Sequence, residues 1–232
     1  MADRELIDEE GQDKALSSSQ RALSQLRTMI FSGDLPAGSD HLESELAKRL
    51  SMSRTPVREA ILTLEGQGLL ELRPRKGVRI LPVSPEDMAE VYDVLTELES
   101  LAAGSAAAAG YTDNELAGLL QAIDDLDVAI SNADLDAWAK ADDRFHTELV
   151  RLGGNSRVMG IVYMMSDQVR RARATTLALR PLPTKSNEDH RRVYSAIRDG
   201  DAKTARATHR AHRREAKNII VGLLEKHRLR FV

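Results

Sequence analysis

The spacing of hydrophobic residues predicts three short helices near the N-terminus. Apolar residues recur three and four positions apart in each, which is the period of a helix with one buried face. Ser53 suits the position just before the third helix, and Pro56 falls in its first turn, where a missing N–H costs little. The expected buried faces are Leu23, Leu26 and Ile30 in the first helix, Leu42, Leu46, Ala47 and Leu50 in the second, and Val57, Ala60, Ile61 and Leu64 in the third.

Two short segments of alternating polarity, residues 69–73 and 77–81, follow the third helix. Alternation is the period of a strand, and the turn residues between the two segments predict a β-hairpin. Three helices and a hairpin in this order predict a winged helix-turn-helix, which we place at residues 19–82. The acidic and polar residues before it, 1–18, are expected to form a disordered arm.

The rest of the chain, residues 83–232, has a helical pattern that is interrupted at glycine and proline residues. Six helices in this segment predict an antiparallel bundle. The predicted fold class is therefore mainly α, with an N-terminal winged helix-turn-helix and a C-terminal six-helix antiparallel bundle. The helices are expected at roughly 85–109, 112–131, 134–152, 155–179, 186–199 and 201–228.

The amino-acid composition excludes several kinds of functional site and several classes of protein. The absence of cysteine excludes disulfides, thiolate chemistry and cysteine-ligated zinc. No apolar run is long enough to span a bilayer, and the acidic N-terminus does not resemble a signal peptide, so we expect a cytoplasmic protein without a membrane partner. The formal net charge is -3, whereas residues 20–82 carry ten basic and seven acidic side chains and are the segment best suited to a polyanion.

Basic residues mark the third helix and the hairpin as a surface that binds DNA. If Val57 and the other apolar residues of this helix are buried, Arg54, Thr55 and Arg58 point outward near its start, as in a recognition helix. The hairpin adds basic residues at its turn, where Gly77 would allow a close approach to a groove. The basic residues of the hairpin are Arg73, Arg75, Lys76 and Arg79. Arginines on an exposed helix are often only solvated surface, but their order within a winged helix favours DNA binding.

A second set of polar residues lies on predicted buried faces. Asp142 falls in the apolar stripe of the helix at 134–152, and His146 lies one turn further on. His190 and His212 share faces with apolar residues of the last two helices. A buried carboxylate needs a partner, and three imidazoles with one carboxylate suit a divalent transition metal. Simple hydrogen-bonded core pairs are the alternative, and His209 competes for the fourth ligand position.

The motifs of the first domain carry a family resemblance. Residues 20–82 resemble the DNA-binding domain of the GntR family of transcription regulators. The resemblance implies that Ser53, Arg54, Thr55, Arg58 and the wing-tip Gly77 contact DNA, and we add Arg75 and Lys76. One departure from the family pattern is Ser44, which stands where the fatty-acid-responsive relatives have a further arginine that contacts DNA. The motifs are residues 33–38 (GDLPAG), 46–50 (LAKRL), 53–60 (SRTPVREA), 64–69 (LEGQGL) and 75–78 (RKGV).

Residues 84–228 resemble the FadR-type C-terminal domain, or FCD domain, in its VanR-like six-helix form. The motifs are Asp142-x3-His146, Gly154-Asn155, Glu188-Asp189-His190 and His212. The resemblance implies a metal held by Asp142, His146, His190 and His212, with zinc our first choice and nickel, manganese and iron the alternatives. Arg170 and Arg173, three residues apart on one helix face, are candidates to bind the carboxylate of an effector, and a solvated position on the surface is the alternative. Leu95 replaces an arginine that is the usual carboxylate anchor of many relatives.

These features predict a transcription regulator and not an enzyme. We expect the regulator to be a repressor. We expect a homodimer that binds operator DNA and responds to a small organic acid at the metal site. One alternative is an architectural DNA-binding protein with a purely structural metal. Another is a metal-dependent hydrolase fused to a DNA-binding domain, although no HExxH or GxSxG motif is present.

Overall fold

The computed structural model describes residues 16–227 and divides them into two compact units, with the boundary between Pro82 and Val83. Residues 1–15 of the expected arm lie outside the described residues, as does the expected end of the last helix at residue 228. No helix of the described chain combines the length and the apolar composition that crossing a membrane requires. The mainly helical fold predicted from the sequence is confirmed.

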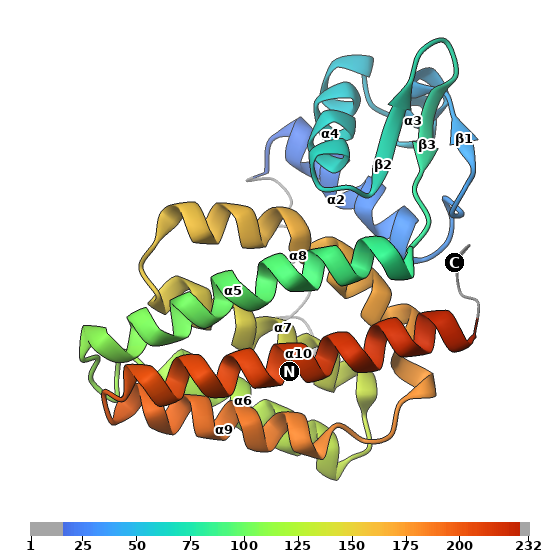
Figure 1. Ribbon diagram of the computed structural model, residues 1–232. Coiled ribbons are helices and arrows are strands. Elements are labelled where there is room, and N and C mark those ends of the chain that lie inside the picture. The colour runs from blue at the N-terminus through green and yellow to red at the C-terminus, as the bar shows by residue number, and fades with distance from the viewer. Residues whose placement is uncertain (1–15, 228–232) are drawn as a thin grey trace, which may run out of the picture. The chain divides into compact units, whose positions relative to one another are not determined.

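The first unit contains three helices and a small antiparallel sheet (Figure 1). The helix α2 begins with a capping box in which Ser17 and Gln20 exchange hydrogen bonds, so it starts at Ser18, the last residue of the expected arm. The buried face predicted for α4 is confirmed. The elements are α2 (Ser18–Phe31), β1 (Asp40–His41), α3 (Glu43–Arg49), α4 (Arg54–Gly66), β2 (Leu70–Arg73) and β3 (Gly77–Ile80).

The sheet has a third strand that the hydrophobic pattern did not predict. β1 pairs with β3 and gives the strand order β1-β3-β2. Gly77 is needed where these strands meet, because it has a φ of +82° and a Cβ there would collide with the backbone carbonyl of His41. Leu42, expected in the core, instead precedes α3 as its N-cap residue and is 47% exposed.

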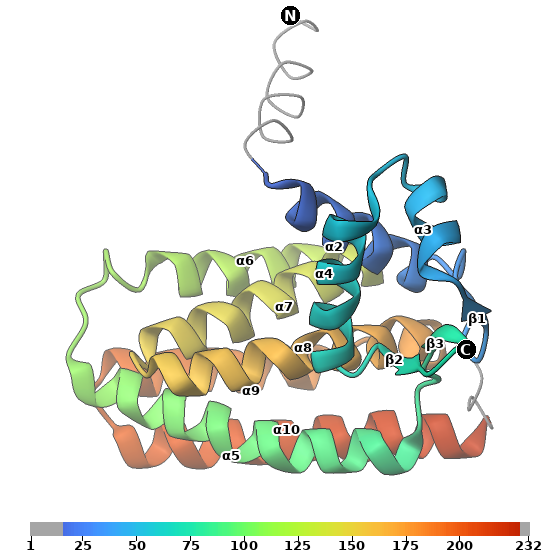
Figure 2. The same ribbon diagram turned by 90° about the horizontal axis from the view of Figure 1, so that it is seen from above.

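The second unit is a bundle of helices. Figures 1 and 2 show its first helix α5 and its last helix α10 side by side, and these two make the most extensive contact within the bundle. Apolar faces from α5 to α10 form its core. The helices are α5 (Pro85–Ala109), α6 (Ala117–Ser131), α7 (Leu135–Leu152), α8 (Ser156–Thr176), α9 (Thr184–Arg198) and α10 (Ala202–Lys226), with a 3₁₀ turn η1 (Leu177–Leu179) after α8.

Three details of the bundle differ from the sequence prediction. α6 starts at Ala117 instead of residue 112, because Thr112 and Glu115 hydrogen-bond to each other in a turn that precedes the helix. The expected helix at 155–179 tightens into the 3₁₀ turn after Thr176. The buried face of α10 carries His209, His212 and Ile220, whereas Ile219, one of the apolar residues that the helical period places on the face of His212, is 40% exposed.

Candidate DNA interface and candidate metal centre

The residues expected to contact DNA are exposed at two places in the first unit. Ser53 is the N-cap residue of α4, and its side chain makes no capping hydrogen bond. Arg54 and Thr55 occupy the first turn, and Arg58 follows one turn later on the same face. In Figure 1 this end of α4 and the β2–β3 turn both lie at the upper end of the unit. Ser53, Arg54, Thr55, Arg58, Arg75 and Lys76 are all exposed.

Some of the basic side chains of this unit form ion pairs with neighbouring acidic residues. Arg58 forms an ion pair of 3.4 Å with Glu43 on α3, and its side chain is 62% exposed. Asp40 accepts from Arg79 at 3.3 Å and from Arg73 at 3.4 Å beside the hairpin. Exposed pairs of this kind contribute little to stability, so the arginines can exchange them for phosphate or base contacts.

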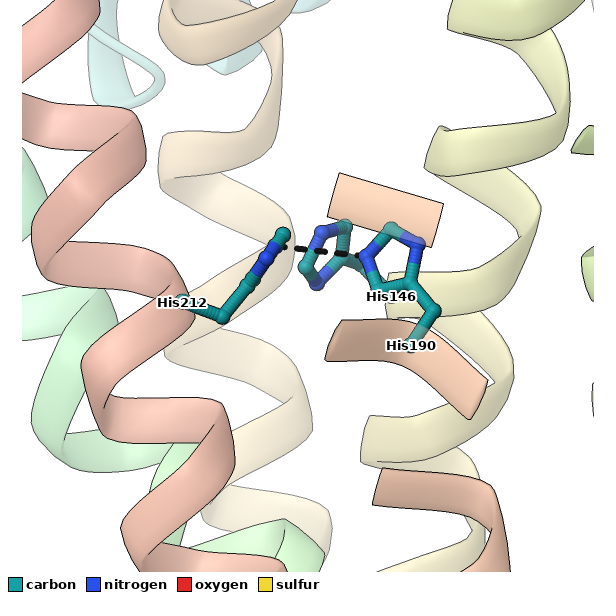
Figure 3. Close-up of side chains that lie close together, drawn as sticks. All are labelled: His146, His190 and His212. Atoms are coloured by element: carbon teal, nitrogen blue, oxygen red, sulfur yellow. Dashed lines mark hydrogen bonds between the residues drawn. The ribbon is translucent and has the colours of Figure 1, made fainter. Parts of the chain in front are cut away.

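Side chains from three helices converge at the centre of the bundle. α7 supplies Asp142 and His146, α9 supplies His190 and α10 supplies His212. Figure 3 shows the three imidazoles turned toward one another, and one nitrogen from each lies within 4.8 Å of the others. His190 Nε2 is 3.2 Å from His212 Nε2, and the Asp142 carboxylate is 3.6 Å from both His146 Nε2 and His190 Nε2. The structure therefore brings together the four residues that the resemblance implied.

The protonation states of this cluster suit a cation. Burial would raise the pKa of Asp142, but Arg173 and the nearby histidines outweigh it and lower the pKa to about 2. Burial lowers the pKa of His190 and His212 well below the usual value. At neutral pH Asp142 is therefore a carboxylate, and His190 and His212 are neutral imidazoles, which are the forms in which these side chains ligate metals.

Unsatisfied atoms within the cluster also fit a metal ion. Asp142 Oδ1 is buried and has no hydrogen-bond partner among the described residues, an arrangement that costs free energy in a closed bundle. Two nitrogens bound at 2.0–2.1 Å to a tetrahedral zinc lie about 3.3 Å apart. The 3.2 Å between His190 Nε2 and His212 Nε2 matches that separation. The residues present therefore fit a divalent transition metal.

Glu99 on α5 orients this cluster, and sequence reasoning missed it. The buried Glu99 Oε2 lies 2.8 Å from His146 Nδ1, so the hydrogen bond leaves His146 Nε2 facing the other imidazoles. Glu99 Oε1 is 3.1 Å from Arg213 Nη2 on α10. Burial opposes ionisation, but Arg213 and His146 hold the pKa of Glu99 well below its usual value. A signal existed in the sequence, since Glu99 falls on the apolar face of α5 four residues after Leu95.

His209, the competing ligand, hydrogen-bonds to Glu99 and does not belong to the group formed by His146, His190 and His212. Its Nε2 lies 3.1 Å from Glu99 Oε2, and burial lowers its pKa to about 4. Glu99, His146 and His209 also form a close group of potential ligand atoms. His146 thus has one nitrogen in each group, because Nδ1 faces Glu99 and Nε2 faces Asp142.

The two arginines proposed for effector binding have different surroundings. Arg173 is 5% exposed and contacts Asp142 at 2.9 Å and Asp143 at 2.6 Å. Arg170 is more exposed and pairs with Asp143 at 2.8 Å and Asp167 at 2.9 Å. A cavity of about 170 Å³ opens beside Asp142, His146 and His212, and Arg173 lines it while Arg170 does not.

Comparison with known proteins accounts for both units. Residues 18–80 match the model "Bacterial regulatory proteins, gntR family", and residues 90–215 match the FCD domain. This chain belongs to the GntR family of bacterial transcription regulators. This chain is 40% identical to an uncharacterized HTH-type transcriptional regulator of Agrobacterium vitis over 127 aligned residues. The aligned residues are 54% of this GntR-family chain and 72% of that protein.

Two further proteins support this placement. A protein of Paenarthrobacter nicotinovorans, named as a probable D-xylose utilization operon transcriptional repressor, is 31% identical over 76% of each chain. A solved GntR structure from Rhodococcus sp. RHA1 has the same fold, with a TM-score of 0.70 and 22% identity over 89% of this chain and 99% of that one. The GntR-family chain is thus a DNA-binding transcription regulator and not an enzyme, as the sequence predicted.

Glu99 should matter for the stability of this GntR-family regulator. We expect Glu99→Gln to lower the free energy of unfolding by on the order of 3 kcal/mol, because the buried Arg213 would lose its carboxylate partner. Glu97→Gln on the same helix is the control, since Glu97 pairs with Arg210 at the surface and its loss should cost less than about 1 kcal/mol. Denaturant unfolding of metal-free protein at pH 7 measures both. Equal effects of the two substitutions would contradict the role of Glu99.

Proposed function

We propose that this GntR-family protein is a homodimeric repressor whose affinity for operator DNA is controlled by a small organic acid bound at a metal site in its C-terminal bundle. Residues 19–82 bind the operator, and residues 83–232 bind metal and effector and form the dimer. One observation carries the proposal: Asp142, His146, His190 and His212 meet, buried, beside a cavity. The FCD match and relatives named as repressors support it.

The metal ligands in this proposal are Asp142 and the Nε2 atoms of His146, His190 and His212. Zinc is our first choice, with nickel, manganese or iron as alternatives, because imidazole and carboxylate ligands do not discriminate strongly among them. When bound, the ion would supply a Lewis-acidic centre that attracts an acid. Arg173, with its guanidinium against Asp142, is suited to hold a carboxylate of that acid. Arg170 is a weaker candidate, because it lies outside the lining of the cavity.

The recognition surface in this proposal consists of Ser53, Arg54, Thr55 and Arg58 on α4 with Arg75, Lys76 and Gly77 of the wing. The backbone N–H groups at the start of α4 would add a phosphate contact. Arg58 is the side chain that we expect to read a base, because a guanidinium can donate two hydrogen bonds to guanine. Gly77 is needed for strand packing against His41, whatever contact it also makes with DNA.

Arg58→Ala should weaken binding to the preferred operator by about 1–3 kcal/mol and leave the fold intact, since the side chain is exposed. The target is duplex DNA that the wild-type protein selects from a random-sequence pool, and affinity is measured by fluorescence anisotropy at fixed salt. Arg198→Ala, a surface change on α9 of the bundle, is the control. If Arg58→Ala and Arg198→Ala bind the selected DNA as wild type does, Arg58 does not read the operator.

We further propose a homodimer, because one winged helix offers few contacts and two-fold proteins double the site on palindromic DNA. Large apolar side chains are exposed on α8, which supports an interface there. They are Met159, Ile161, Tyr163 and Met164. Light scattering should give twice the chain mass of 25.6 kDa, and a monomeric mass with and without DNA would contradict the dimer.

The proposed control of operator affinity by an acid bound in the bundle is tested by measuring DNA binding in the presence of candidate acids. With the protein in excess zinc, at least one of a panel of short carboxylic acids should change operator affinity by about 5- to 150-fold. His190→Ala should abolish this response, because it removes a ligand, while DNA binding persists. His227→Ala, an exposed histidine outside the cluster, is the matched control and should respond as wild type. An unaltered response in His190→Ala would favour an architectural protein or a core of simple polar pairs.

A further inference from the structure

The cavity beside the candidate metal centre contains one arginine without an acidic partner. Arg173 pairs with Asp142 and Asp143, and Arg213 pairs with Glu99. Arg180, in the connection between α8 and α9, lines the same cavity and has no carboxylate within ion-pair distance among residues 16–227. Its Nη2 donates to Thr176 Oγ1 at 3.0 Å, whereas its buried Nε has no partner.

The charge of Arg180 is therefore poorly compensated. Burial and the nearby Arg173 lower the pKa of Arg180 to about 10, so the side chain remains a cation at neutral pH in surroundings that disfavour one. Lys185, in the first turn of α9 and also on the wall of the cavity, is by contrast matched by Asp189 at 2.8 Å. A bound metal ion would add further positive charge. An anion in the cavity would relieve this imbalance.

Tyr92 provides a second unmatched group in the same cavity. Its side chain on α5 is fully buried, and its hydroxyl has no hydrogen-bond partner in the described structure. The Arg213 guanidinium covers its ring at 4.8 Å. The positive charges of Arg213, Arg173 and Arg180 all act on this hydroxyl, although burial dominates and raises its pKa. Tyr92 thus lines the same cavity as Arg180 and has a phenolic O–H whose hydrogen bond is not made within the described structure.

The remaining walls of the cavity are apolar, and its volume is small. Trp138, Leu182 and Ile219 contribute to these walls. A volume of about 170 Å³ accommodates a short carbon chain and excludes a large ligand. Groups that bind anions thus lie around a space that suits a few methylenes.

We propose, on the basis of the function proposed above, that the effector is a short dicarboxylate. One carboxylate lies beside Asp142, His146, His190 and His212. The second accepts hydrogen bonds from the Arg180 guanidinium and the Tyr92 hydroxyl. Arg180 and Tyr92 therefore determine specificity for a diacid over a monoacid of equal length, and neither was singled out from the sequence.

Trp138 allows a direct test, because it is the only tryptophan of the chain and lines the cavity. Zinc-loaded protein is titrated with malonate, succinate and glutarate, and with propionate, butyrate and valerate as matched monoacids, while tryptophan fluorescence is followed. We expect at least one diacid to bind about 10- to 100-fold more tightly than its matched monoacid, because charged hydrogen bonds favour the second carboxylate.

The variants separate this second-carboxylate site from the rest of the pocket. Arg180→Met should remove most of the preference for the diacid, and Tyr92→Phe should reduce it. Arg198→Met, a change on the exposed surface of α9 outside this cavity, should leave it unchanged. Arg180→Met should also remain folded, because no buried acid loses a partner. Equal binding of diacids and monoacids by the wild type, or an unchanged preference in Arg180→Met, would overturn the proposal.

Operator binding distinguishes this proposal from the one on which it rests. If diacids bind with dependence on Arg180 but leave operator affinity unchanged, the dicarboxylate site stands and effector control fails. If another acid shifts operator affinity equally in wild type and Arg180→Met, effector control stands and the dicarboxylate proposal is overturned.

Discussion

Two carboxylates buried at the centre of the bundle, Asp142 and Glu99, impose the main physical constraint on this protein. Asp142 and Glu99 are 2% and 2% exposed, and a buried charge is strongly unfavourable unless positive or hydrogen-donating groups surround it. Arg173 and Arg213 meet this requirement in part, and the histidines complete it. The polar centre of the bundle is thus an interdependent network, in which removing one member leaves another uncompensated.

This network joins helices that are distant in sequence. Glu99 on α5 contacts His146 on α7 and Arg213 on α10, and Asp142 on α7 contacts Arg173 on α8 and lies close to His190 on α9. α5 follows directly after the linker that ends the winged helix. A change of charge at the centre would act on α5 through the Glu99 hydrogen bonds, and this is the physical basis for the coupling that we propose between ligand binding and DNA affinity.

Local pattern predicted much of this structure. The period of apolar residues identified the buried face of α4, and the proline and glycine breaks at Pro85 and Gly110 identified the bounds of α5. Asp142 was recognisable because it interrupts an apolar stripe. β1 was missed, since a two-residue strand has no period, and its pairing with β3 depends on distant residues.

Most contacts between the residues of the site could not be predicted from the local sequence pattern. Glu99 and Arg213 meet only when α5 and α10 pack together, although they are 114 positions apart in sequence order. Tyr92 and Arg180 are also unremarkable in sequence, because an aromatic residue in a core and an arginine in a loop are common. Their significance depends on the partners that each lacks in the folded bundle.

The central claim is that the buried cluster on α7, α9 and α10 is a metal site. The most direct measurement is the metal content of protein purified without chelators and incubated with zinc, combined with X-ray absorption at the metal edge. The account predicts about one ion per chain, ligated by three imidazole nitrogens and at least one oxygen, with zinc bound poorly when Asp142 is changed to Asn. Protein that stays free of zinc, nickel, manganese and iron after such incubation would contradict it.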